Sequence, residues 1–420
     1  MRSAGFSLPK LPLWQRLLDI FETCKKLLCH MKTTLTVATL ILLPLSAFAQ
    51  SCGGSFGGFV QEMKTEAVAK GHSQGSVDQF FANVRQDRKV IRADRAQGIF
   101  QMPFTDFSRR LISQNRLNAG KRNGQKWDAV FDRVEQEFGV SRGVLLAFWA
   151  FETDVGAVQG SFNTVNALVT LSHDCRRPEL FRPQVFAALE LCERGDLDPG
   201  RTTGAWAGEI GMVQMLPEDI LVNGVDGDGD GEVNLKTSPA DALMSGGNML
   251  RSLGWKSGQP WMQEVDMPQE FDWSQSGLGT WKPASDWVNA GVTPRSGQLS
   301  APNLDAAILL PQGRKGPAFL VYPNYEVFFE WNQSFIYVTT AAYFATRLEG
   351  ASVYDAGSPD PALSDGEMKA LQQKLSARGY DVGGIDGILG ARTRDAVQKE
   401  QTRLGLPADA WPTRQLLDRL

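Results

Sequence analysis

The chain has 420 residues, of which 42% are hydrophobic and 21% are charged, with 43 Lys and Arg against 47 Asp and Glu. This length is sufficient for a large buried core and predicts two or three domains. The net charge of −4 gives no electrostatic attraction to nucleic acid or to an anionic membrane surface, so we exclude both as partners.

Residues 1–49 are predicted to be an export signal rather than part of a folded domain. From Met31 they carry one Lys, an apolar run over 35–45 and a small-x-small site at Ala47–Ala49, as in a cleaved secretory signal peptide. The apolar run is too short for a stable membrane span, and an uncleaved N-terminal anchor is the alternative. The pattern is compatible with Met31 as the true start, in which case residues 1–30 are a mis-assigned extension. We expect a soluble periplasmic protein without a membrane anchor, with 37 basic and 45 acidic residues once residues 1–49 are removed.

Three cysteines remain after cleavage: Cys52, Cys175 and Cys192. Cys175 and Cys192 are seventeen residues apart and flank a predicted helix, which favours a disulfide between them in an oxidising compartment. Two reduced cysteines are the alternative. Because the mature chain has no Cys-x-x-Cys pair and only His72 and His173, the sequence does not support a zinc site.

Helical patterns dominate to about residue 260. The predicted helices are Phe59–Gly71, Gln125–Phe138, Arg142–Thr153, Pro183–Arg194 and Ala240–Leu253. Residues 254–305 are rich in Gly, Pro, Ser and Trp and predict irregular structure. The apolar runs Ala306–Pro311 and Phe319–Tyr322 then predict a small β-hairpin. A helix over Gln333–Leu348, a linker over 351–365 and a compact helical unit over 366–420 complete the chain.

One carboxyl group occupies an unusual place in the third predicted helix. Ser141 is a suitable N-cap, and Leu145, Phe148, Trp149 and Glu152 follow at the spacing i, i+3, i+4, i+7. Glu152 therefore lies on an apolar stripe, where burial raises the pKa of a carboxyl group. A carboxyl that stays protonated near neutral pH suits a general acid for glycosidic cleavage. The residues alone leave open a Glu that caps or pairs structurally at a helix end.

Several motifs occur in order within residues 55–350. They include F-E-T-D-V-G at Phe151–Gly156, N-A-L-V-T-L-S at Asn166–Ser172, G-A-W-A-G-E-I-G-M-V-Q-M-L-P at Gly204–Pro217 and W-N-Q-S at Trp331–Ser334. Together they resemble the lytic murein transglycosylase B family. The resemblance implies a mainly α, lysozyme-like α+β catalytic domain over 55–350 with a small β-hairpin subdomain. It also implies a single catalytic Glu, which is matched here by Glu152.

The resemblance further implies a reaction that needs no cofactor. Glu152 first protonates the glycosidic oxygen between N-acetylmuramic acid and N-acetylglucosamine, and then acts as base on the C6 hydroxyl of the same muramoyl residue. The product is a 1,6-anhydro sugar. Such an intramolecular nucleophile removes the need for a second carboxylate that activates water. Gln214, Asn332 and Tyr337 are implied to line the glycan groove, with ordinary packing or capping as the alternative for each.

Two residues depart from the family pattern. Ala205 stands where the family commonly has a Ser that contacts the muramoyl sugar, so this contact is lost or supplied otherwise. Glu209 stands where several relatives carry a small residue, and it is either a second acid or a helix-surface charge, of which the second is favoured. A hydrolytic muramidase would need a second carboxylate, from Glu209 or Asp174. A non-catalytic peptidoglycan-binding scaffold is a further alternative.

An acidic loop has the D-x-D-x-D-G start of an EF-hand at Asp226, Asp228 and Asp230. Three carboxylates on one short loop repel each other unless a cation lies between them. Thr237 replaces the usual bidentate Glu at the twelfth position. The resemblance offers Asp241 as a later ligand, with Glu232 contributing its backbone carbonyl. The sequence therefore predicts a structural Ca²⁺ site, with a metal-free acidic turn as the alternative.

The unit over 366–420 resembles a peptidoglycan-binding domain of the small three-helix type. The resemblance rests on G-Y-D-V-G at Gly379–Gly383, I-D-G at Ile385–Gly387 and the apolar positions around them. Such units can also be plain stabilising appendages. A wall-binding unit beside a wall-cutting domain predicts a protein, expected to be a monomer, whose partner is the glycan strand of peptidoglycan.

Overall fold

The computed structural model describes residues 52–96 and 102–420. The predicted signal peptide over 1–49 lies outside these residues. Within the described part of the chain, no helix combines the length and the apolar character needed to cross a bilayer.

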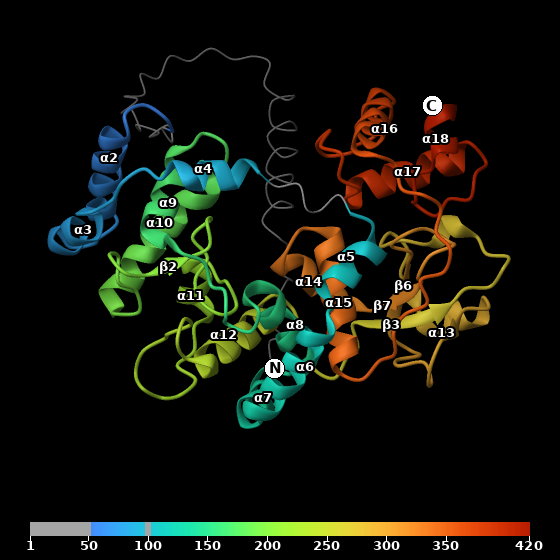
Figure 1. The fold of residues 1–420 in the computed structure, drawn as a ribbon, viewed down its shortest axis with the longest axis horizontal. Helices are drawn as coiled ribbons and strands as arrows, with labels where there is room; N and C mark the ends of the chain where they lie inside the picture. The colour runs from blue at the N-terminus through green and yellow to red at the C-terminus, as the bar shows by residue number, and fades with distance from the viewer. Residues whose placement is uncertain (1–51, 97–101) are drawn as a thin grey trace, which may run out of the picture. The chain divides into compact units, whose positions relative to one another are not determined.

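The first group of helices lies around α9 (Thr164–His173) and α10 (Pro178–Arg194) (Figure 1). It also comprises α2 (Phe56–Ala69), α3 (Gln74–Phe81) and α4 (Arg88–Arg95). α9 packs along α10, while α2 and α4 contact α9 and α3 contacts α10. α10 begins at Pro178, earlier than predicted, because Pro is well tolerated at the first helical position. The helix continues through Pro183 and loses one backbone N–H donor there.

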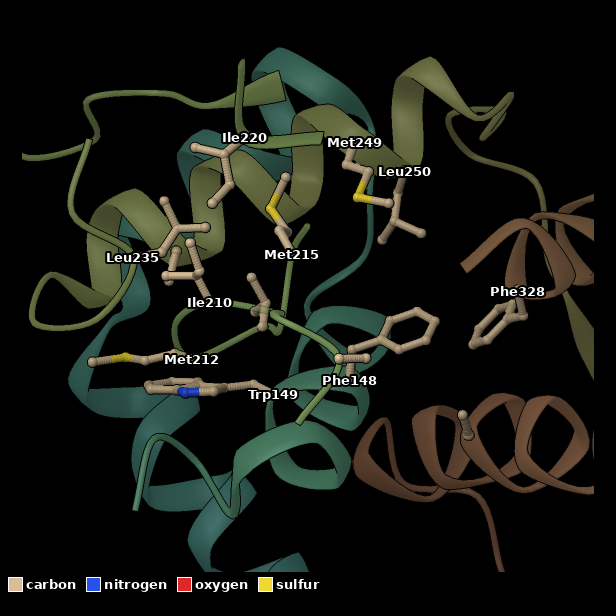
Figure 2. Close-up of a cluster of buried hydrophobic side chains, with 14 of the residues drawn as sticks. Phe148, Trp149, Ile210, Met212, Met215, Ile220, Leu235, Met249, Leu250 and Phe328 are labelled. Atoms are coloured by element: carbon tan, nitrogen blue, oxygen red, sulfur yellow. The ribbon is translucent and has the colours of Figure 1, made fainter. Parts of the chain in front are cut away.

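The second group of helices packs around α8 (Arg142–Thr153), and it positions the candidate site. It comprises α5 (Phe104–Leu111), α6 (Gln114–Lys126), α7 (Asp128–Phe138), α11 (Pro217–Asn223), α12 (Pro239–Ser252), α14 (Pro323–Trp331) and α15 (Phe335–Leu348). α8 lies against α6, α7, α12 and α15, and nine of its twelve residues are buried. Figure 2 shows Phe148 of α8 directed toward Phe328 of α14, and Trp149 beside Met212. Burial of this kind on every side explains why α8 lacks a polar face.

A five-stranded antiparallel sheet has the order β4–β6–β7–β3–β5. Its strands are β3 (Met262–Asp266), β4 (Lys282–Pro283), β5 (Thr293–Pro294), β6 (Asp305–Leu309) and β7 (Phe319–Val321). The predicted hairpin is confirmed, since β6 pairs with β7 with Ile308 opposite Leu320. The prediction that 254–305 is irregular is wrong, because this segment supplies β3, β4 and β5, the 3-10 turn η2 (Trp273–Gln275) and α13 (Ala284–Asn289). Strands of two to five residues are too short to show a period-two pattern. Whether such residues form a strand therefore depends on the strands with which they pair.

The sheet has a core of its own next to the helical one. Trp287 of α13 is fully buried against it, and its indole N–H donates to the Ala306 carbonyl at 2.8 Å. A separate two-stranded pair, β1 (Phe162–Asn163) and β2 (Thr203–Gly204), joins α9 to the segment that precedes α11.

The last three helices form the compact C-terminal unit that was expected. They are α16 (Asp365–Ala377), α17 (Ala391–Arg403) and α18 (Arg414–Arg419), and they enclose a separate apolar core. A capping box opens α16, in which Ser364 accepts from the Glu367 amide and Glu367 accepts from the Ser364 amide. We refer to residues 364–420 below as the C-terminal module.

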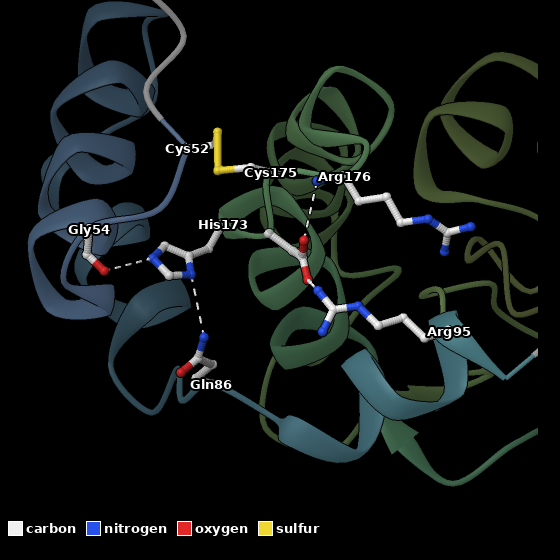
Figure 3. The surroundings of a disulfide bond; sticks show 8 residues. Cys52, Gly54, Gln86, Arg95, His173, Cys175 and Arg176 are labelled. Carbon is white, nitrogen blue, oxygen red and sulfur yellow. Dashed lines mark hydrogen bonds and ion pairs between the residues drawn. A yellow bond between two sulfur atoms is a disulfide. The ribbon is translucent and has the colours of Figure 1, made fainter.

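The disulfide joins Cys52 to Cys175, so the predicted bond between Cys175 and Cys192 is wrong (Figure 3). Cys175 lies just before α10 and the free Cys192 in its last turns, which separates their Cα atoms by roughly 20 Å at 1.5 Å per residue. A disulfide requires a Cα separation below about 7 Å. The Cα atoms of Cys52 and Cys175 are 5.1 Å apart, and the Gly53 amide donates to the His173 carbonyl at 2.9 Å. The start of the described chain is therefore fixed to the end of α9.

Candidate active site

Glu152 occupies the last turn of α8, one residue before the helix ends at Thr153. The next two residues, Asp154 and Val155, have φ of 51° and 61°, which is unusual for residues other than Gly and costs most for a β-branched side chain. Thr153 Oγ1 donates to the Met212 carbonyl at 2.7 Å and accepts from the Gly156 amide at 2.9 Å. The end of α8 is thus held in a sharp turn against the segment that contains Met212.

Two side chains from another part of the chain donate hydrogen bonds to the Glu152 carboxyl group. The Tyr337 hydroxyl donates to Glu152 Oε1 at 2.5 Å, and the indole N–H of Trp331 donates to the same oxygen at 3.1 Å. Trp331 is held by stacking on Phe148, with ring centroids 4.3 Å apart. The donors therefore come from the end of α14 and the start of α15, opposite the α8 carboxyl.

Burial raises the pKa of Glu152 from 4.5 to about 7. The hydrogen bonds from Tyr337 and Trp331 act in the opposite direction, because they stabilise the anion, while the charge of Glu209 raises the pKa further. Burial and the nearby carboxylate raise the pKa of Tyr337 well above its ordinary value, so its hydroxyl remains a donor. Near neutral pH, both protonation states of Glu152 are accessible.

Glu152 opens into a cavity of about 380 Å³. The other lining residues are Ala205, Glu209, Gln214, Met215, Leu216, Asp219, Met249, Trp331 and Asn332. The structure thus brings the predicted groove residues Gln214 and Asn332 together with Glu152. Tyr337 does not line this cavity. It is buried and contacts the Glu152 carboxyl instead of facing the space that a ligand would occupy.

Gln214 is held in place by its own backbone turn. Ile210 and Met215 exchange two backbone hydrogen bonds, at 2.8 and 3.1 Å, and Gln214 precedes Met215 with φ of 53°. Its side-chain amide donates to the Gly211 carbonyl at 2.7 Å. A residue other than Gly keeps this strained backbone conformation only where the surrounding structure holds it, as is common in binding sites.

Glu209 is not a helix-surface charge, and that expectation is wrong. It lies in the turn between β2 and the Ile210–Met215 pair, and it lines the cavity. Its Oε2 atom is buried and has no hydrogen-bond partner among the described residues. Burial raises the pKa of Glu209, which favours the neutral carboxyl. Asp174, the other candidate for a second carboxylate, does not line the cavity and pairs with Arg95 at 2.8 Å.

The acidic loop forms a group separate from the cavity residues. One carboxylate oxygen from each of Asp226, Asp228 and Asp230 lies within 4.8 Å of the other two. Asp241 lies outside this group. Its Oδ1 accepts from the Gly227 amide at 2.9 Å and its Oδ2 from the Asn234 amide at 2.7 Å. Its fully buried side chain therefore supports the loop backbone. The exposed Glu232 donates its amide to Asp230 Oδ1 at 2.9 Å.

Comparison with known proteins agrees with this arrangement. Residues 55–346 match the family model described as "Transglycosylase SLT domain", and residues 364–420 match "Putative peptidoglycan binding domain". The chain belongs to the transglycosylase SLT domain family. Its mainly helical architecture with small antiparallel sheets confirms the fold class expected from the resemblance.

Solved structures and one curated protein show how far the similarity to other members extends. The structure of SltB3 from Pseudomonas aeruginosa in complex with NAG-anhNAM-pentapeptide is 35% identical, with a TM-score of 0.80 over 87% of this chain and 99% of that one. Membrane-bound lytic murein transglycosylase B of Escherichia coli K12 is 27% identical over 190 residues, so the chain spans about half (52%) of the length of that relative and 45% of its own. The calcium complex of E. coli Slt35 shares the fold, with 22% identity and a TM-score of 0.59 over 72% of this chain and 97% of that one.

Two cavity residues of this family member escaped the sequence reasoning. Trp331 lies in the W-N-Q-S motif, but only the packing of α14 on α8 shows that it donates to Glu152. Asp219 lies in the first turn of α11, and burial together with the nearby Glu218 raises its pKa. An acidic residue in the first turn after a Pro is an ordinary helix-start signal, so sequence gave no reason to place it in a site.

Proposed function

We propose that this chain is a lytic transglycosylase that cleaves the β-1,4 bond between N-acetylmuramic acid and N-acetylglucosamine and leaves 1,6-anhydromuramoyl ends. The observation that carries the proposal is the Glu152 carboxyl, with a pKa of about 7 and two hydrogen-bond donors, at the wall of a cavity. Family membership and the muropeptide complexes of SltB3 support peptidoglycan as the substrate.

The proposed reaction uses one carboxyl group twice, first as an acid and then as a base. Protonated Glu152 donates to the glycosidic oxygen, and the bond between that oxygen and C1 of the muramoyl residue breaks. The resulting carboxylate is stabilised by Tyr337 and Trp331, whose donors already face Oε1. Glu152 then takes the proton of the C6 hydroxyl while that oxygen forms a bond to C1. The acid is regenerated and no water is consumed.

Hydrolysis by the same cavity is the less favoured reaction. An inverting muramidase would need an ionised second carboxylate to activate water. Glu209 and Asp219 line the cavity with Glu152, but burial raises the pKa of both, so each ionises less readily than an ordinary carboxyl group. A non-catalytic scaffold would have no need of a buried carboxyl whose pKa lies near 7, since burial of such a group costs stability.

We further propose roles for the cavity amides and for the acidic loop. Gln214 and Asn332 would hydrogen-bond the sugar beside Glu152, since both line its cavity. Asp226, Asp228 and Asp230, with the Glu232 carbonyl, would hold a Ca²⁺ ion, because one side-chain oxygen of each Asp lies within 4.8 Å of the other two. The ion would fix the loop and take no part in the reaction. E. coli Slt35, which shares the fold, has been solved in complex with calcium.

Export to the periplasm is the last part of the proposal. The sequence pattern over 31–49 supports it, as does a disulfide, which persists in oxidising compartments. N-terminal sequencing of the protein recovered from a periplasmic extract should begin near Gln50. Recovery of the protein only from the cytoplasm would contradict export.

The identity of the product tests the reaction. Purified mature protein is incubated with sacculi, and the released muropeptides are analysed by mass spectrometry, with Glu152→Gln as the blank. We expect anhydro ends, which are one water lighter than reducing ends. Predominantly reducing ends would establish hydrolysis instead, and sacculus binding without any release by the wild type would establish a scaffold.

A further inference from the structure

The C-terminal module contacts the segment that carries both donors to Glu152. Trp331 ends α14, Tyr337 lies in the first turn of α15, and Phe335 lies between them in sequence. The guanidinium group of Arg394, on α17 of the module, lies 4.1 Å from the centroid of the Phe335 ring. A contact from the module thus falls two residues from Tyr337 and four from Trp331.

Arg394 is held in this contact by backbone oxygens. It donates to the Pro311 carbonyl at 2.5 Å and to the Leu310 carbonyl at 3.4 Å, both in the loop between β6 and β7. Arg394 forms no ion pair with a carboxylate of the described residues. The nearby Asp409 pairs instead with Arg314 at 3.3 Å. Its Nε atom is buried and has no hydrogen-bond partner among the described residues.

Arg394 is partly exposed, but its Nε atom is buried. A partly buried cation without an ion pair costs free energy that an interface with a purely adhesive role would not need. Burial lowers the pKa of Arg394 to about 10, which reflects this cost. Two small cavities, of about 140 and 90 Å³, flank its side chain, so apolar packing does not close the contact around it. Other polar bonds also hold the module, chiefly those from Gln398 to the Ser276 and Trp273 carbonyls at 2.7 and 3.2 Å.

We propose that Arg394 is a positioning residue, which stacks on Phe335 and thereby holds the start of α15 where Tyr337 donates to Glu152. The C-terminal module is then part of the catalytic arrangement as well as a wall-binding unit. The inference rests on the proposed function only for its kinetic test, because the hydrogen bond between Tyr337 and Glu152 can also be followed without turnover.

The sign of the expected effect follows from the groups around Glu152. Tyr337 from α15 and Trp331 from α14 stabilise its anion, whereas the charge of Glu209 destabilises it. A displaced Tyr337 hydroxyl therefore raises the pKa of Glu152. Around Arg394 itself, Asp409 and Tyr325 favour its charged form, so it stays a cation throughout the neutral range.

The test compares Arg394→Met with Gln398→Ala in the full mature chain. The substrate is a set of soluble glycan strands stripped of their peptides. We expect Arg394→Met to lower kcat about ten-fold with KM little changed, and to move the basic limb of the pH profile upward. Pelleting with sacculi should stay at the wild-type level. Gln398→Ala removes module contacts that do not touch the segment 331–337, so it should leave kcat and the pH profile unchanged.

Equal kcat values and pH profiles for the two variants would overturn the proposal. If Arg394→Met does not fold, Arg394→Lys keeps the charge but loses the planar fork, and it should show the same upward shift with a smaller loss of kcat. Should the wild type prove inactive, the pKa of Glu152 can be obtained from the pH dependence of unfolding, with and without Glu152→Gln, in each background. An unchanged pKa in the Arg394→Met background would refute the positioning role whatever the enzyme's activity.

Discussion

Two groups of acidic side chains, in the cavity and in the acidic loop, have different surroundings. In the cavity, Glu152, Glu209 and Asp219 are desolvated, and burial raises the pKa of each. In the acidic loop, Asp226 is solvated and accepts from three backbone amides, including that of Gly231 at 2.9 Å, and these bonds lower its pKa. The same functional group is therefore poised to carry a proton in one place and to stay an anion in the other.

This contrast separates a site for proton transfer from a site for a cation. A general acid needs a low-polarity wall that retains the proton, whereas a Ca²⁺ ligand must be ionised and reachable. Substitution in the cavity should therefore change activity without loss of stability, and substitution in the loop should change stability without loss of activity. The predictions below test this division.

The largest effect is expected for Glu152→Gln. It removes the proton donor but keeps the shape of the side chain, so cleavage should fall by about 10³-fold. Release of muropeptides from sacculi measures it. Asp154→Asn is the matched control, because Asp154 is two residues away and pairs at the surface with Arg116. An equal loss in both variants would mean that the helix end, rather than the acid, matters.

The same variant should be more stable than the wild type at pH 8. The raised pKa means that ionising Glu152 opposes folding, so the wild type loses stability as the pH rises from about 4.5 to about 7. Thermal unfolding at pH 4 and pH 8 checks this, with the gain expected at pH 8 alone. A Glu152→Gln variant that is less stable at both pH values would contradict burial as the cause.

Tyr337→Phe should have the next largest effect. It removes a hydrogen bond to the anion that Glu152 becomes, so kcat should fall by about ten-fold or more. Because that bond lowers the pKa of Glu152, the basic limb of the pH profile should move upward. A wild-type profile in this variant would show that the hydrogen bond has no role in the reaction.

Glu209→Gln should have a smaller effect, in the opposite direction. Removal of a negative charge lowers the pKa of Glu152, so the basic limb should move down by less than about one pH unit while cleavage continues. Loss of all activity would instead mark Glu209 as an essential second carboxylate. Product analysis of that variant would then distinguish hydrolysis from transfer.

The smallest effect on activity is expected in the loop. Ca²⁺ at 1 mM should raise Tm by a few degrees in the wild type and not in Asp228→Asn/Asp230→Asn, while kcat stays equal in both proteins. Differential scanning calorimetry in Ca²⁺ and in EDTA measures the shift. A kcat that depends on Ca²⁺ would contradict the claim that the acidic loop affects stability but not activity.

Much of the catalytic helix could be predicted from the sequence. The start of α8 after Ser141, its apolar run and the position of Glu152 all depend on neighbours within a few residues, and the structure has them as expected. The Ser141 side chain, however, makes no capping hydrogen bond. The hairpin of β6 and β7 followed for the same reason. The two-residue strands β4 and β5 and the Cys52–Cys175 bond could not be found, because each is created by a partner far along the chain.

The sequence by itself determined that a carboxyl would lie on an apolar helix, within a family whose motifs run from Phe151 to Ser334. Only the tertiary structure decided what surrounds that carboxyl. Tyr337 became a donor to Glu152 rather than a groove residue, and Glu209 became a cavity carboxyl rather than a surface charge. The reason is physical: helix periodicity acts over a few residues, whereas desolvation and hydrogen bonding depend on side chains that are distant in sequence, from Glu209, 57 residues after Glu152, to Tyr337, 185 residues after it.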